Sequence, residues 1–504
     1  MSKRILWNAY RLNLSRYQSG YAWHSRLFSS CRATRAPNPQ HLRRPNYNVK
    51  DIANDPQKYI ESCELRRLPN EASLIPDIVE NYLRINKTRA ELSEHYKERK
   101  VKQRLVMRAT PEERRELLAS LETIKQSTDA GEKKIEALNE ELYSWLHSIP
   151  NLLPDDCPIS EEEVDHYICT PPPSGSVPVI NENEFAVPID CKADYPDHVE
   201  IGTKLGIIDL KTASKISGHA FYYLIGDGAM LEHALVQYAL SRVKQYGFKV
   251  MLPPSVVRRE YALACGFRPR DADGERQIYN LSVAGGNPIE DEEVLCLTGT
   301  AEIPLAAYNS ERELRAAELP LKLAGVSRSY RAEAGGRGRD TRGIYRVHEF
   351  TKVELFAWVD DNAEDVVNDQ TPSAQMLESL RELQEKIISD LGLYCRILNM
   401  PANDLGASAY KKYDIEAWMP GRKGWGEITS ASNCTDYQAR RLHTRVKHAN
   451  GSLTYAHTLN GTAMAVPRVI VAILENFYDP QREAVWIPKP LRRYMDDRVW
   501  IEKQ

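Results

Sequence analysis

The fold of this chain is decided by residues 326–359, which read VSRSYRAEAGGRGRDTRGIYRVHEFTKVELFAWV. Two strand-like runs flank a polar loop, residues 334–343, that contains four glycines and three arginines. Side chains alternate between the two faces of a strand, so the second run has one mostly apolar face: Tyr345, Val347, Glu349, Thr351, Val353 and Leu355. Its other face carries Arg346, His348, Phe350, Lys352, Glu354 and Phe356. The pattern predicts a sheet with a hydrophobic core below and a binding site above.

The residue types on the second face indicate what such a site could bind. In the first run, Arg331 and Glu333 also share one face, and the planar guanidinium of arginine matches phosphate oxygens bidentately. An aromatic side chain on the same platform can stack on a nucleobase. The alternative is an amphipathic strand with surface salt bridges, which explains the concentration of functional residue types less well. Spacing alone does not name the ligand.

A further anion site is predicted nearer the C-terminus. Leu459-Asn460-Gly461-Thr462 precedes residues 463–475, which read as an apolar helix with Arg468 in its early turns. A helix N-terminus and an arginine together attract an anion. The alternative is an arginine that caps a core helix, and in isolation that is the better interpretation.

The composition of the chain excludes several classes of protein. It has 504 residues, 42% hydrophobic and 27% charged, which is typical of a globular protein and excludes a wholly disordered or collagen-like chain. No apolar run reaches the ~18 residues of a membrane-spanning helix, so we expect no membrane insertion. The nine cysteines include no CxxC pair, so we expect neither a disulfide scaffold nor a zinc site.

The N-terminal segment differs from the rest in charge. Residues 1–50 contain ten Lys or Arg and no Asp or Glu, although the whole chain carries a net charge of −3. A Ser-rich, Arg-rich segment without acidic residues is typical of a mitochondrial transit peptide. We therefore predict that residues 1–45 are a disordered transit peptide and that the protein works in the mitochondrial matrix. A basic arm that binds nucleic acid is the alternative.

The next segment, residues 74–145, reads as a helical hairpin. Between the two helices, Thr110 can cap a helix, Pro111 suits its first turn and Glu113 completes a capping box. We expect one helix to end near Met107 and a second to begin near Pro111, the two forming an antiparallel coiled coil. The second helix carries a heptad seam, made of Leu117, Leu121, Ile124, Thr128, Gly131, Ile135, Leu138, Leu142 and Trp145.

A basic run approaches the turn of this hairpin and contains Lys97, Arg99, Lys100, Lys102 and Arg104. A basic tip on an arm suits contact with a nucleic-acid backbone. A solvated helical surface is the commoner explanation of a charge run, and the run alone does not decide between the two.

The segments that carry chemistry resemble the class II aminoacyl-tRNA synthetases and, within them, the seryl-tRNA synthetases in their mitochondrial form. The second signature of that family is matched by RAEAG (residues 331–335) and RDTRGIYRVHEFTKVE (339–354). The other matches are the serine-binding loop TAE (300–302), EITS (427–430), NCTDYQARR (433–441), the third signature (459–468) and the first signature, a dimer-interface helix and strand (231–253). The hairpin is similar to the tRNA-binding arm of the family.

The resemblance implies an α+β fold, with the class II antiparallel sheet, flanking helices and an N-terminal antiparallel coiled-coil arm. The domains would be residues 1–45 (transit peptide), 46–150 (helical-hairpin tRNA-binding domain), 151–195 (linker) and 196–504 (catalytic domain). The function implied is that of a homodimeric serine–tRNA ligase. It would activate L-serine with ATP to seryl-adenylate and then transfer serine to the 3′ end of tRNA(Ser). Such chemistry depends on positioning and charge neutralisation.

The resemblance also assigns ATP-binding roles. Two arginines would be catalytic: Arg331 on the α-phosphate, and Arg468, which would reach the γ-phosphate and stack on adenine opposite Phe350. Glu427 and Ser430 would bind Mg²⁺, which screens phosphate charge. The remaining ATP-binding candidates are Ala332, Glu333, Arg346, Val347, His348, Glu349, Ile428 and Thr429.

Serine selection would use both polar ends of the amino acid. The serine-binding candidates are Thr300, Ala301, Glu302, Arg331, Glu354 and Thr462. Glu302 would bind the α-ammonium group and Glu354 would accept the hydroxyl. A site built around a hydroxyl rejects the analogue that lacks it by roughly four orders of magnitude.

Four positions depart from the commoner family pattern: Ala332, Glu349, Thr462 and Pro467. None of them removes a residue that the chemistry requires, and Pro467 costs little if it occupies the first helical turn. Two competing functions follow from the same segments. A catalytically inactive paralogue should have lost the arginines and glutamates named above, and a ligase that charges a small carrier protein should have lost the hairpin.

Overall fold

The computed structural model describes residues 42–168, 195–267, 278–281, 294–332, 342–361 and 370–503. The chain divides into two units, residues 1–43 and 44–504, and the helices and strands described belong to the second unit. Nearly all of the predicted transit peptide lies outside the described residues, as do Glu333 and most of the glycine-rich loop that follows it.

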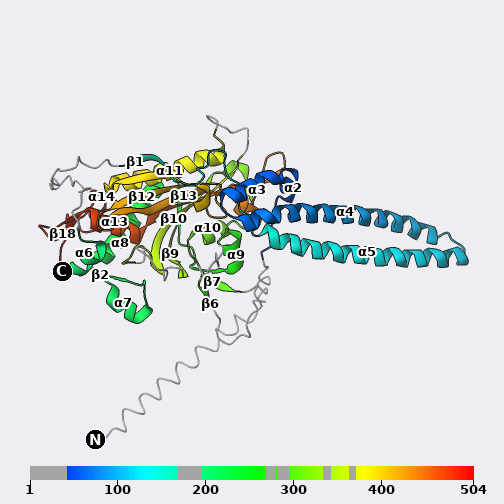
Figure 1. Cartoon of the computed structure of the whole chain (residues 1–504), viewed down its shortest axis with the longest axis horizontal. Helices are drawn as coiled ribbons and strands as arrows, with labels where there is room; N and C mark the ends of the chain where they lie inside the picture. The colour runs from blue at the N-terminus through cyan, green and yellow to red at the C-terminus, as the bar shows by residue number, and fades with distance from the viewer. Residues whose placement is uncertain are drawn as a thin grey trace, which may run out of the picture. The chain divides into compact units, whose positions relative to one another are not determined.

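An eight-stranded sheet forms the centre of the second unit, with strand order β1-β11-β12-β13-β16-β10-β9-β4 (Figure 1). Neighbouring strands pair antiparallel, except that β4 runs parallel to β9. The predicted α+β fold with an antiparallel sheet is therefore confirmed. The strands are β1 (Glu163–Ile168), β4 (Lys249–Met251), β9 (Leu321–Tyr330), β10 (Glu349–Val359), β11 (Cys395–Asn399), β12 (Lys411–Met419), β13 (Gly424–Asn433) and β16 (His457–Ala465).

Three helices pack on this sheet in one hydrophobic core: α8 (Asp227–Gln245), α11 (Pro372–Leu391) and α13 (Val466–Asn476). Val353 and Leu355 of β10 are fully buried in that core. Because side chains alternate along a strand, their neighbours on β10 emerge on the opposite face of the sheet. This arrangement confirms the core face that the sequence predicted for this part of the strand.

The second strand-like run of residues 326–359 is shorter than its pattern predicted. β10 begins at Glu349, and residues 344–348 form turns and bends. Arg346 and His348 therefore do not lie on the strand face that alternation assigned to them, and that part of the prediction was wrong.

The backbone before β10 is fixed by a left-handed glycine and a buried histidine. Gly343 has a φ of +74°, and the backbone N–H of Ile344 donates to Nε2 of buried His198 at 3.2 Å. Since Nε2 accepts, the ring proton is on Nδ1, which donates to Oε1 of Glu475 at 2.8 Å. These contacts turn the chain at the point where the alternating pattern expected a strand.

The helical hairpin turns where the sequence predicted, but its first helix begins at Pro69, earlier than the predicted residue 74. It consists of α4 (Pro69–Val106) and α5 (Pro111–Leu146), which lie side by side in Figure 1. The capping box is present, because the Glu113 carboxylate accepts from the backbone N–H of Thr110 at 2.9 Å and from its hydroxyl at 2.8 Å. Every residue of the predicted heptad seam is buried or half-buried.

Two short helices, α2 (Val49–Asn54) and α3 (Pro56–Leu65), precede the hairpin, and Arg66 ties its base to the sheet domain. The Arg66 guanidinium is buried and donates to the carbonyl oxygen of Ala409 at 2.6 Å and to that of Leu152 at 3.3 Å. The hairpin base therefore ends in a specific polar contact with the sheet domain.

Part of the predicted linker belongs to the sheet. Residues 163–168 form β1 and pair with β11, so this stretch is an edge strand, whereas residues 169–194 lie outside the described residues. No helix in the described parts of the chain is long and apolar enough to cross a bilayer.

The remaining elements are short. A two-stranded sheet consists of β2 (Ile208–Asp209) and β3 (Tyr223–Leu224). A three-stranded sheet consists of β5 (Val256–Arg258), β6 (Asn280–Leu281) and β7 (Leu295–Leu297). A second three-stranded sheet consists of β8 (Glu313–Arg315), β14 (Arg445–Lys447) and β15 (Leu453–Tyr455). The short helices are α6 (His198–Lys204), α7 (Leu210–Ser217), α9 (Arg259–Ala264), α10 (Glu302–Ala307), α12 (Tyr437–Leu442) and α14 (Lys489–Arg492).

The C-terminal segment, to which the sequence assigned no role, packs on the body of the domain. It forms the small sheet β17 (Tyr478–Asp479), β18 (Ala484–Trp486) and β19 (Trp500–Ile501). Arg498 binds the buried carboxylate of Asp227 bidentately, at 2.8 and 2.5 Å. Because Asp227 is the first residue of α8, this pair fixes the start of a core helix.

The turn at Gly343 yields a test of the fold. A Cβ atom at Gly343 would lie 2.0 Å from His198 Nε2, so Gly343→Ala must displace the histidine as well as strain the backbone. Gly206 also has a positive φ of +73°, but a Cβ there would meet nothing within 4 Å.

We expect Gly206→Ala to cost only the left-handed strain, about 1–2 kcal/mol. Gly343→Ala should lower the thermal unfolding midpoint several times more. Equal shifts in the two variants would show that the packing of Gly343 on His198 does not stabilise the fold.

Candidate active site

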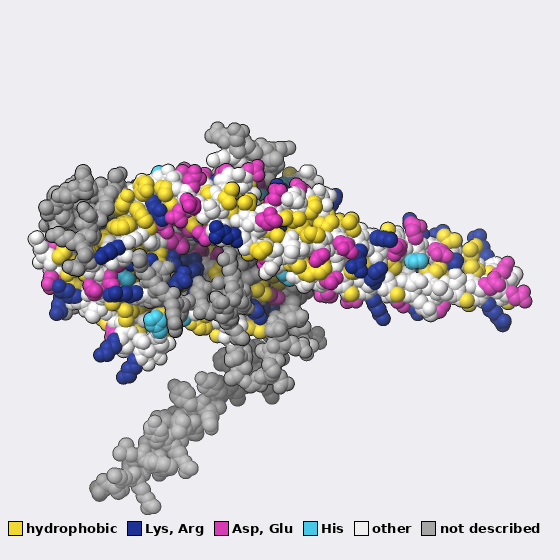
Figure 2. Space-filling view, viewed as in Figure 1, with side chains coloured by type: hydrophobic (Ala, Val, Ile, Leu, Met, Phe, Trp, Pro, Cys, Tyr) yellow, Lys and Arg dark blue, Asp and Glu magenta, His cyan; other side chains and the backbone are white. Residues whose placement is uncertain are grey.

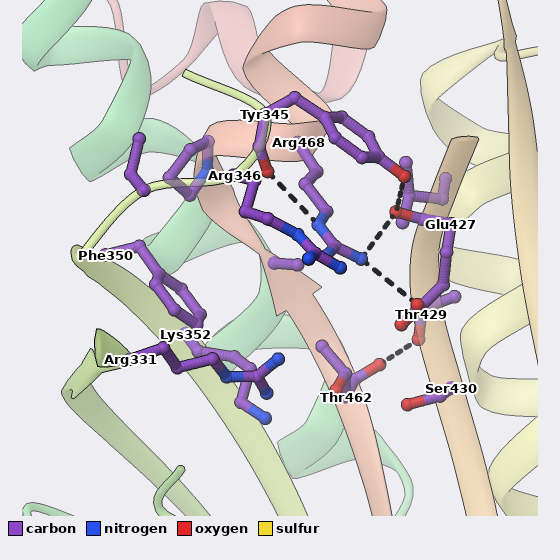
Figure 3. Close-up of a pocket in the computed structure, with 14 residues that line it drawn as sticks. Arg331, Tyr345, Arg346, Phe350, Lys352, Glu427, Thr429, Ser430, Thr462 and Arg468 are labelled. Atoms are coloured by element: carbon purple, nitrogen blue, oxygen red, sulfur yellow. Dashed lines mark hydrogen bonds and ion pairs between the residues drawn. The ribbon is translucent and has the colours of Figure 1, made fainter. Parts of the chain in front are cut away.

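A pocket opens on the face of the sheet opposite the helical core, where β10, β13 and β16 meet the start of α13 (Figure 3). Of the residues proposed from the sequence, ten line it: Arg331, Arg346, Val347, Phe350, Glu427, Ile428, Thr429, Ser430, Thr462 and Arg468. Four more lining residues were not proposed: Tyr345, Lys352, Ala465 and Pro467. The fold thus brings together segments that are more than a hundred residues apart in the sequence.

Arg468 and Glu427 form one wall of the pocket. Nη1 of Arg468 lies 3.2 Å from Oε2 of Glu427 and donates to the Glu427 carbonyl oxygen at 3.1 Å. The guanidinium also lies 4.7 Å from the ring centroid of Tyr345. Burial raises the pKa of Glu427, but Arg468, Lys412 and Arg331 outweigh it and lower the pKa to about 2. This carboxylate is therefore ionised at neutral pH.

The local sequence explains why Arg468 lies in the first turn of α13. The strand β16 continues to Ala465, and α13 begins at Val466, three residues later than predicted. Pro467 lies in the first turn of the helix, as expected from its missing N–H. Arg468 is therefore in the first turn of α13, where helix N–H groups also favour an anion.

Arg331 and Phe350 form the opposite wall. The Arg331 guanidinium carbon lies 5.5 Å from the Phe350 ring centroid. Arg331 directly follows β9, and Phe350 is the second residue of β10, so antiparallel pairing of these strands holds them together. Figure 3 shows both side chains reaching into the space that faces Arg468. A planar ring beside one arginine, with a second arginine on the opposite wall, can hold a base and its phosphates.

A buried carboxylate cluster adjoins the pocket behind Lys352. Glu354 is 2% exposed, pairs with Lys352 and accepts a hydrogen bond from the Thr300 hydroxyl at 3.2 Å. Burial raises the pKa of Glu354 in spite of Lys352. Burial and the nearby Glu354 carboxylate likewise raise the pKa of Glu302 to about 7. Two carboxylates thus lie close together in a water-poor site, which suits a ligand that brings a cation.

Two of the proposed ATP-binding side chains point elsewhere. Nδ1 of His348 lies 2.9 Å from the Arg331 carbonyl oxygen and 2.8 Å from the Tyr279 hydroxyl. Its ring stacks on Phe221. Glu349 accepts from the Tyr330 hydroxyl at 3.4 Å.

Of the other proposed residues, Ala332 follows Arg331 without lining the pocket. Thr300, Glu302 and Glu354 form the adjoining cluster rather than the pocket wall, and buried Ala301 joins Thr300 to Glu302 along the chain. Glu333 lies outside the described residues.

Of the pocket residues that the sequence analysis did not propose, Lys352 could have been found from strand alternation. Lys352 lies between Phe350 and Glu354 on the same strand face, and alternation had already placed it there. Tyr345 had been assigned to the core face, and no spacing rule could show that it borders both the core and the pocket.

The basic run of the hairpin lies on the last turns of α4. Lys97, Lys100 and Arg104 are exposed, while Arg99 and Lys102 are half-buried. Figure 2 shows acidic side chains interspersed with the basic ones over this hairpin. Among them, Glu98 pairs with Lys102 at 2.7 Å and Glu94 pairs with Lys97 at 2.7 Å.

Comparison with known proteins finds two family matches. Residues 47–153 match the seryl-tRNA synthetase N-terminal domain, and residues 280–477 match the tRNA synthetase class II core domain (G, H, P, S and T). The chain is 40% identical to the mitochondrial serine–tRNA ligase of Saccharomyces cerevisiae, over 91% of this chain and 97% of that protein. It is also 40% identical to the mitochondrial serine–tRNA ligase of Schizosaccharomyces pombe, over 76% of this chain and 74% of that protein.

A solved structure is similar over the same extent. Seryl-tRNA synthetase from Pyrococcus horikoshii, complexed with ATP, matches with a TM-score of 0.77 and 31% identity, covering 91% of this chain and 100% of that one.

Proposed function

The chain belongs to the seryl-tRNA synthetase family, and from this premise we propose how its residues divide the work of a mitochondrial serine–tRNA ligase. The enzyme activates L-serine with ATP, releasing diphosphate, and transfers the serine from seryl-adenylate to the 3′ end of tRNA(Ser), releasing AMP. The observation that carries the assignment of roles is the pocket in which Arg331, Phe350 and Arg468 converge beside the buried carboxylates.

ATP is proposed to occupy the pocket with its adenine on the Phe350 ring and its α-phosphate against Arg331. Arg468 would cover the other face of the base and reach the γ-phosphate, and Arg346 would assist the phosphates. Their positions around one cavity support this arrangement. Because the His348 and Glu349 side chains point elsewhere, residues 347–350 would bind adenine through the backbone, together with Glu333.

Mg²⁺ is proposed to bind at Glu427 and Ser430. Both residues line the ATP pocket, and Glu427 is ionised, so a carboxylate and a hydroxyl of the kind that Mg²⁺ prefers are available. Bound there with ATP, Mg²⁺ would screen the phosphate charges from the incoming serine carboxylate.

Serine is proposed to lie between the ATP pocket and the carboxylate cluster. Glu302 would bind its α-ammonium group, and Glu354, held by Thr300 and Lys352, would accept its hydroxyl. Thr462, on the neighbouring strand β16, pairs directly with Glu354 and completes this wall. Alanine would leave a buried carboxylate without its hydrogen bond, which is the penalty that gives discrimination.

The hairpin is proposed to bind tRNA(Ser) through Lys97, Arg99, Lys100, Lys102 and Arg104. Three of these are exposed on consecutive turns of α4, and the hairpin lies within the region that matches the seryl-tRNA synthetase N-terminal domain. Its presence also argues against a ligase that charges a small carrier protein.

A homodimer is proposed to form through the surface around β3, α8 and β4, which includes residues 231–253, the segment that resembles the first signature. Large apolar side chains gather there in exposed positions: Tyr223, Ile225, Met230, Leu252 and Val256. Leu252 is 82% exposed directly after β4. Water contact at so many apolar side chains is unfavourable and would be relieved by a second copy.

The remaining proposals concern processing and location. Residues 1–45 would be the transit peptide, residues 46–150 the tRNA-binding domain, 151–195 a linker that contributes the edge strand β1, and 196–504 the catalytic domain. The site of action would be the mitochondrial matrix.

Arg331→Ala tests the assignment of the ATP site. It should reduce serine-dependent ATP–diphosphate exchange at least about a hundredfold, because a positive group at the α-phosphate is lost. Arg315→Ala, an exposed arginine paired with Glu318, is the control and should keep full exchange. Normal exchange in a folded Arg331→Ala protein would contradict the assigned role, and no exchange in the unmodified protein would favour the inactive paralogue.

Replacing Lys97, Arg99, Lys100 and Arg104 together by Ala tests the arm. The affinity for tRNA(Ser) should fall and its salt dependence should flatten by about one logarithmic unit of slope per lost phosphate contact. Exchange without tRNA should be unchanged. The matched variant replaces Lys125, Lys133 and Lys134, which are exposed on α5. Equal losses in both variants would argue for a diffuse electrostatic attraction instead of a defined contact.

Leu252→Glu tests the dimer surface. Burying a charge in an apolar interface is costly, so light scattering should report monomers at concentrations where the unmodified protein is dimeric. Leu118→Glu, at a 51%-exposed position of α5, is the control. A dimer that survives Leu252→Glu would place the interface elsewhere.

A further inference from the structure

We propose that Gln438, together with Asn460, is a positioning residue that holds Glu302 ionised and correctly oriented for the α-ammonium group of serine. The inference rests on the serine-binding role proposed for Glu302. Neither amide lines the ATP pocket, and both lie behind the carboxylate that they contact.

Both amides bind the same oxygen of Glu302. Nε2 of Gln438, on α12, donates to Oε1 at 2.6 Å, and Nδ2 of Asn460, on β16, donates to Oε1 at 2.9 Å. Their convergence on Oε1 fixes the carboxylate plane from two separate elements and leaves Oε2 for the ligand. Glu302 is half-buried, whereas Glu354 is fully buried, so Glu302 is the more accessible of the two residues.

The orientation of the Gln438 amide is set by its other neighbours. Its Nε2 also faces the backbone carbonyl oxygen of Cys265 at 3.3 Å, and that oxygen can only accept. Its Oε1 accepts from the Thr458 hydroxyl at 2.8 Å. A flipped amide would place its oxygen against two acceptors, so the N–H must point at Glu302. Gln438 and Thr458 are both fully buried, which makes this arrangement rigid.

The charges around Glu302 explain why its carboxylate needs the two amide hydrogen bonds. The groups that face Glu302 from neighbouring elements are Glu354, Lys352, Arg331, Cys265 and Cys434. Burial and Glu354 favour the protonated form, whereas Gln438, Lys352 and Arg331 favour the ionised form, and the balance sets the pKa of Glu302 to about 7. Since serine enters with a cationic ammonium group, the amides hold the site in the state that binds it.

The experiment measures ATP–diphosphate exchange by the full chain at varied serine, from about pH 6 to about pH 8.5. Gln438→Met keeps the side-chain length and removes the donor. Its KM for serine should rise roughly tenfold or more, with KM for ATP unchanged. Donors to an anion lower its pKa, so losing one raises the pKa of Glu302. The acid limb of kcat/KM for serine should therefore move to higher pH, and the defect should shrink as the pH rises.

Asn460→Leu removes the second donor to Oε1 of Glu302 and should produce the same shift. Asn476→Leu is the matched control: Asn476 is a fully buried amide that donates to the carbonyl oxygens of Trp418 and Ala472 and does not contact Glu302. It should lower thermal stability without moving the acid limb.

Two results for Gln438→Met would overturn the proposal. One is a loss of activity that is equal at every pH, and the other is an unchanged KM for serine. Glu302→Gln separates this failure from failure of the underlying role. If Glu302→Gln leaves KM for serine unchanged, the ammonium partner is misassigned. If it raises KM for serine while Gln438→Met does not, only the positioning role fails.

Discussion

The site depends on a single buried strand that must satisfy two opposite environments at once. Along β10, Val353 and Leu355 pack into the helical core, and Lys352 and Glu354 alternate with them on the other face, with 7% and 2% exposure. Taking an ion out of water costs several kcal/mol unless partners replace the solvent. The Lys352–Glu354 pair and the Thr300 hydroxyl supply those partners. Strand alternation thus fixes the core and the serine-binding groups in one register.

The charges around the pocket separate into two sectors. Arg331 and Arg468 face the space proposed for the phosphates, and Glu302 and Glu354 lie where an ammonium and a hydroxyl are expected. Lys352 stands between the sectors and lines the pocket. The pKa values of two carboxylates are shifted in opposite directions by their neighbours. The pKa of Glu427, beside Arg468, is lowered, whereas the pKa of Glu302, beside the Glu354 carboxylate, is raised. Glu427 is therefore ionised at neutral pH, whereas the charge of Glu302 depends on its amide donors and on the ligand.

Sequence patterns predicted the elements whose cause is local. The Thr110–Glu113 capping box placed the hairpin turn correctly, and two-residue alternation placed Phe350, Lys352 and Glu354 on one face of β10. Sequence patterns did not predict the elements that depend on contacts with residues far away in the chain. The turn before β10 depends on Ile344 donating to His198, which lies 146 positions away, and β1 depends on pairing with β11. Gln438 lies within a motif noticed in the sequence, but its contact with Glu302 appears only when α12 and α10 come together.

The decisive test of the proposed site is a crystal structure of the protein with a non-hydrolysable seryl-adenylate analogue. We expect adenine on the Phe350 ring, the phosphate mimic against Arg331, the serine ammonium group on Glu302 and its hydroxyl on Glu354. An analogue bound outside the cleft between β10, β13 and β16, or bound within it with the serine ammonium group away from Glu302, would contradict the proposed site.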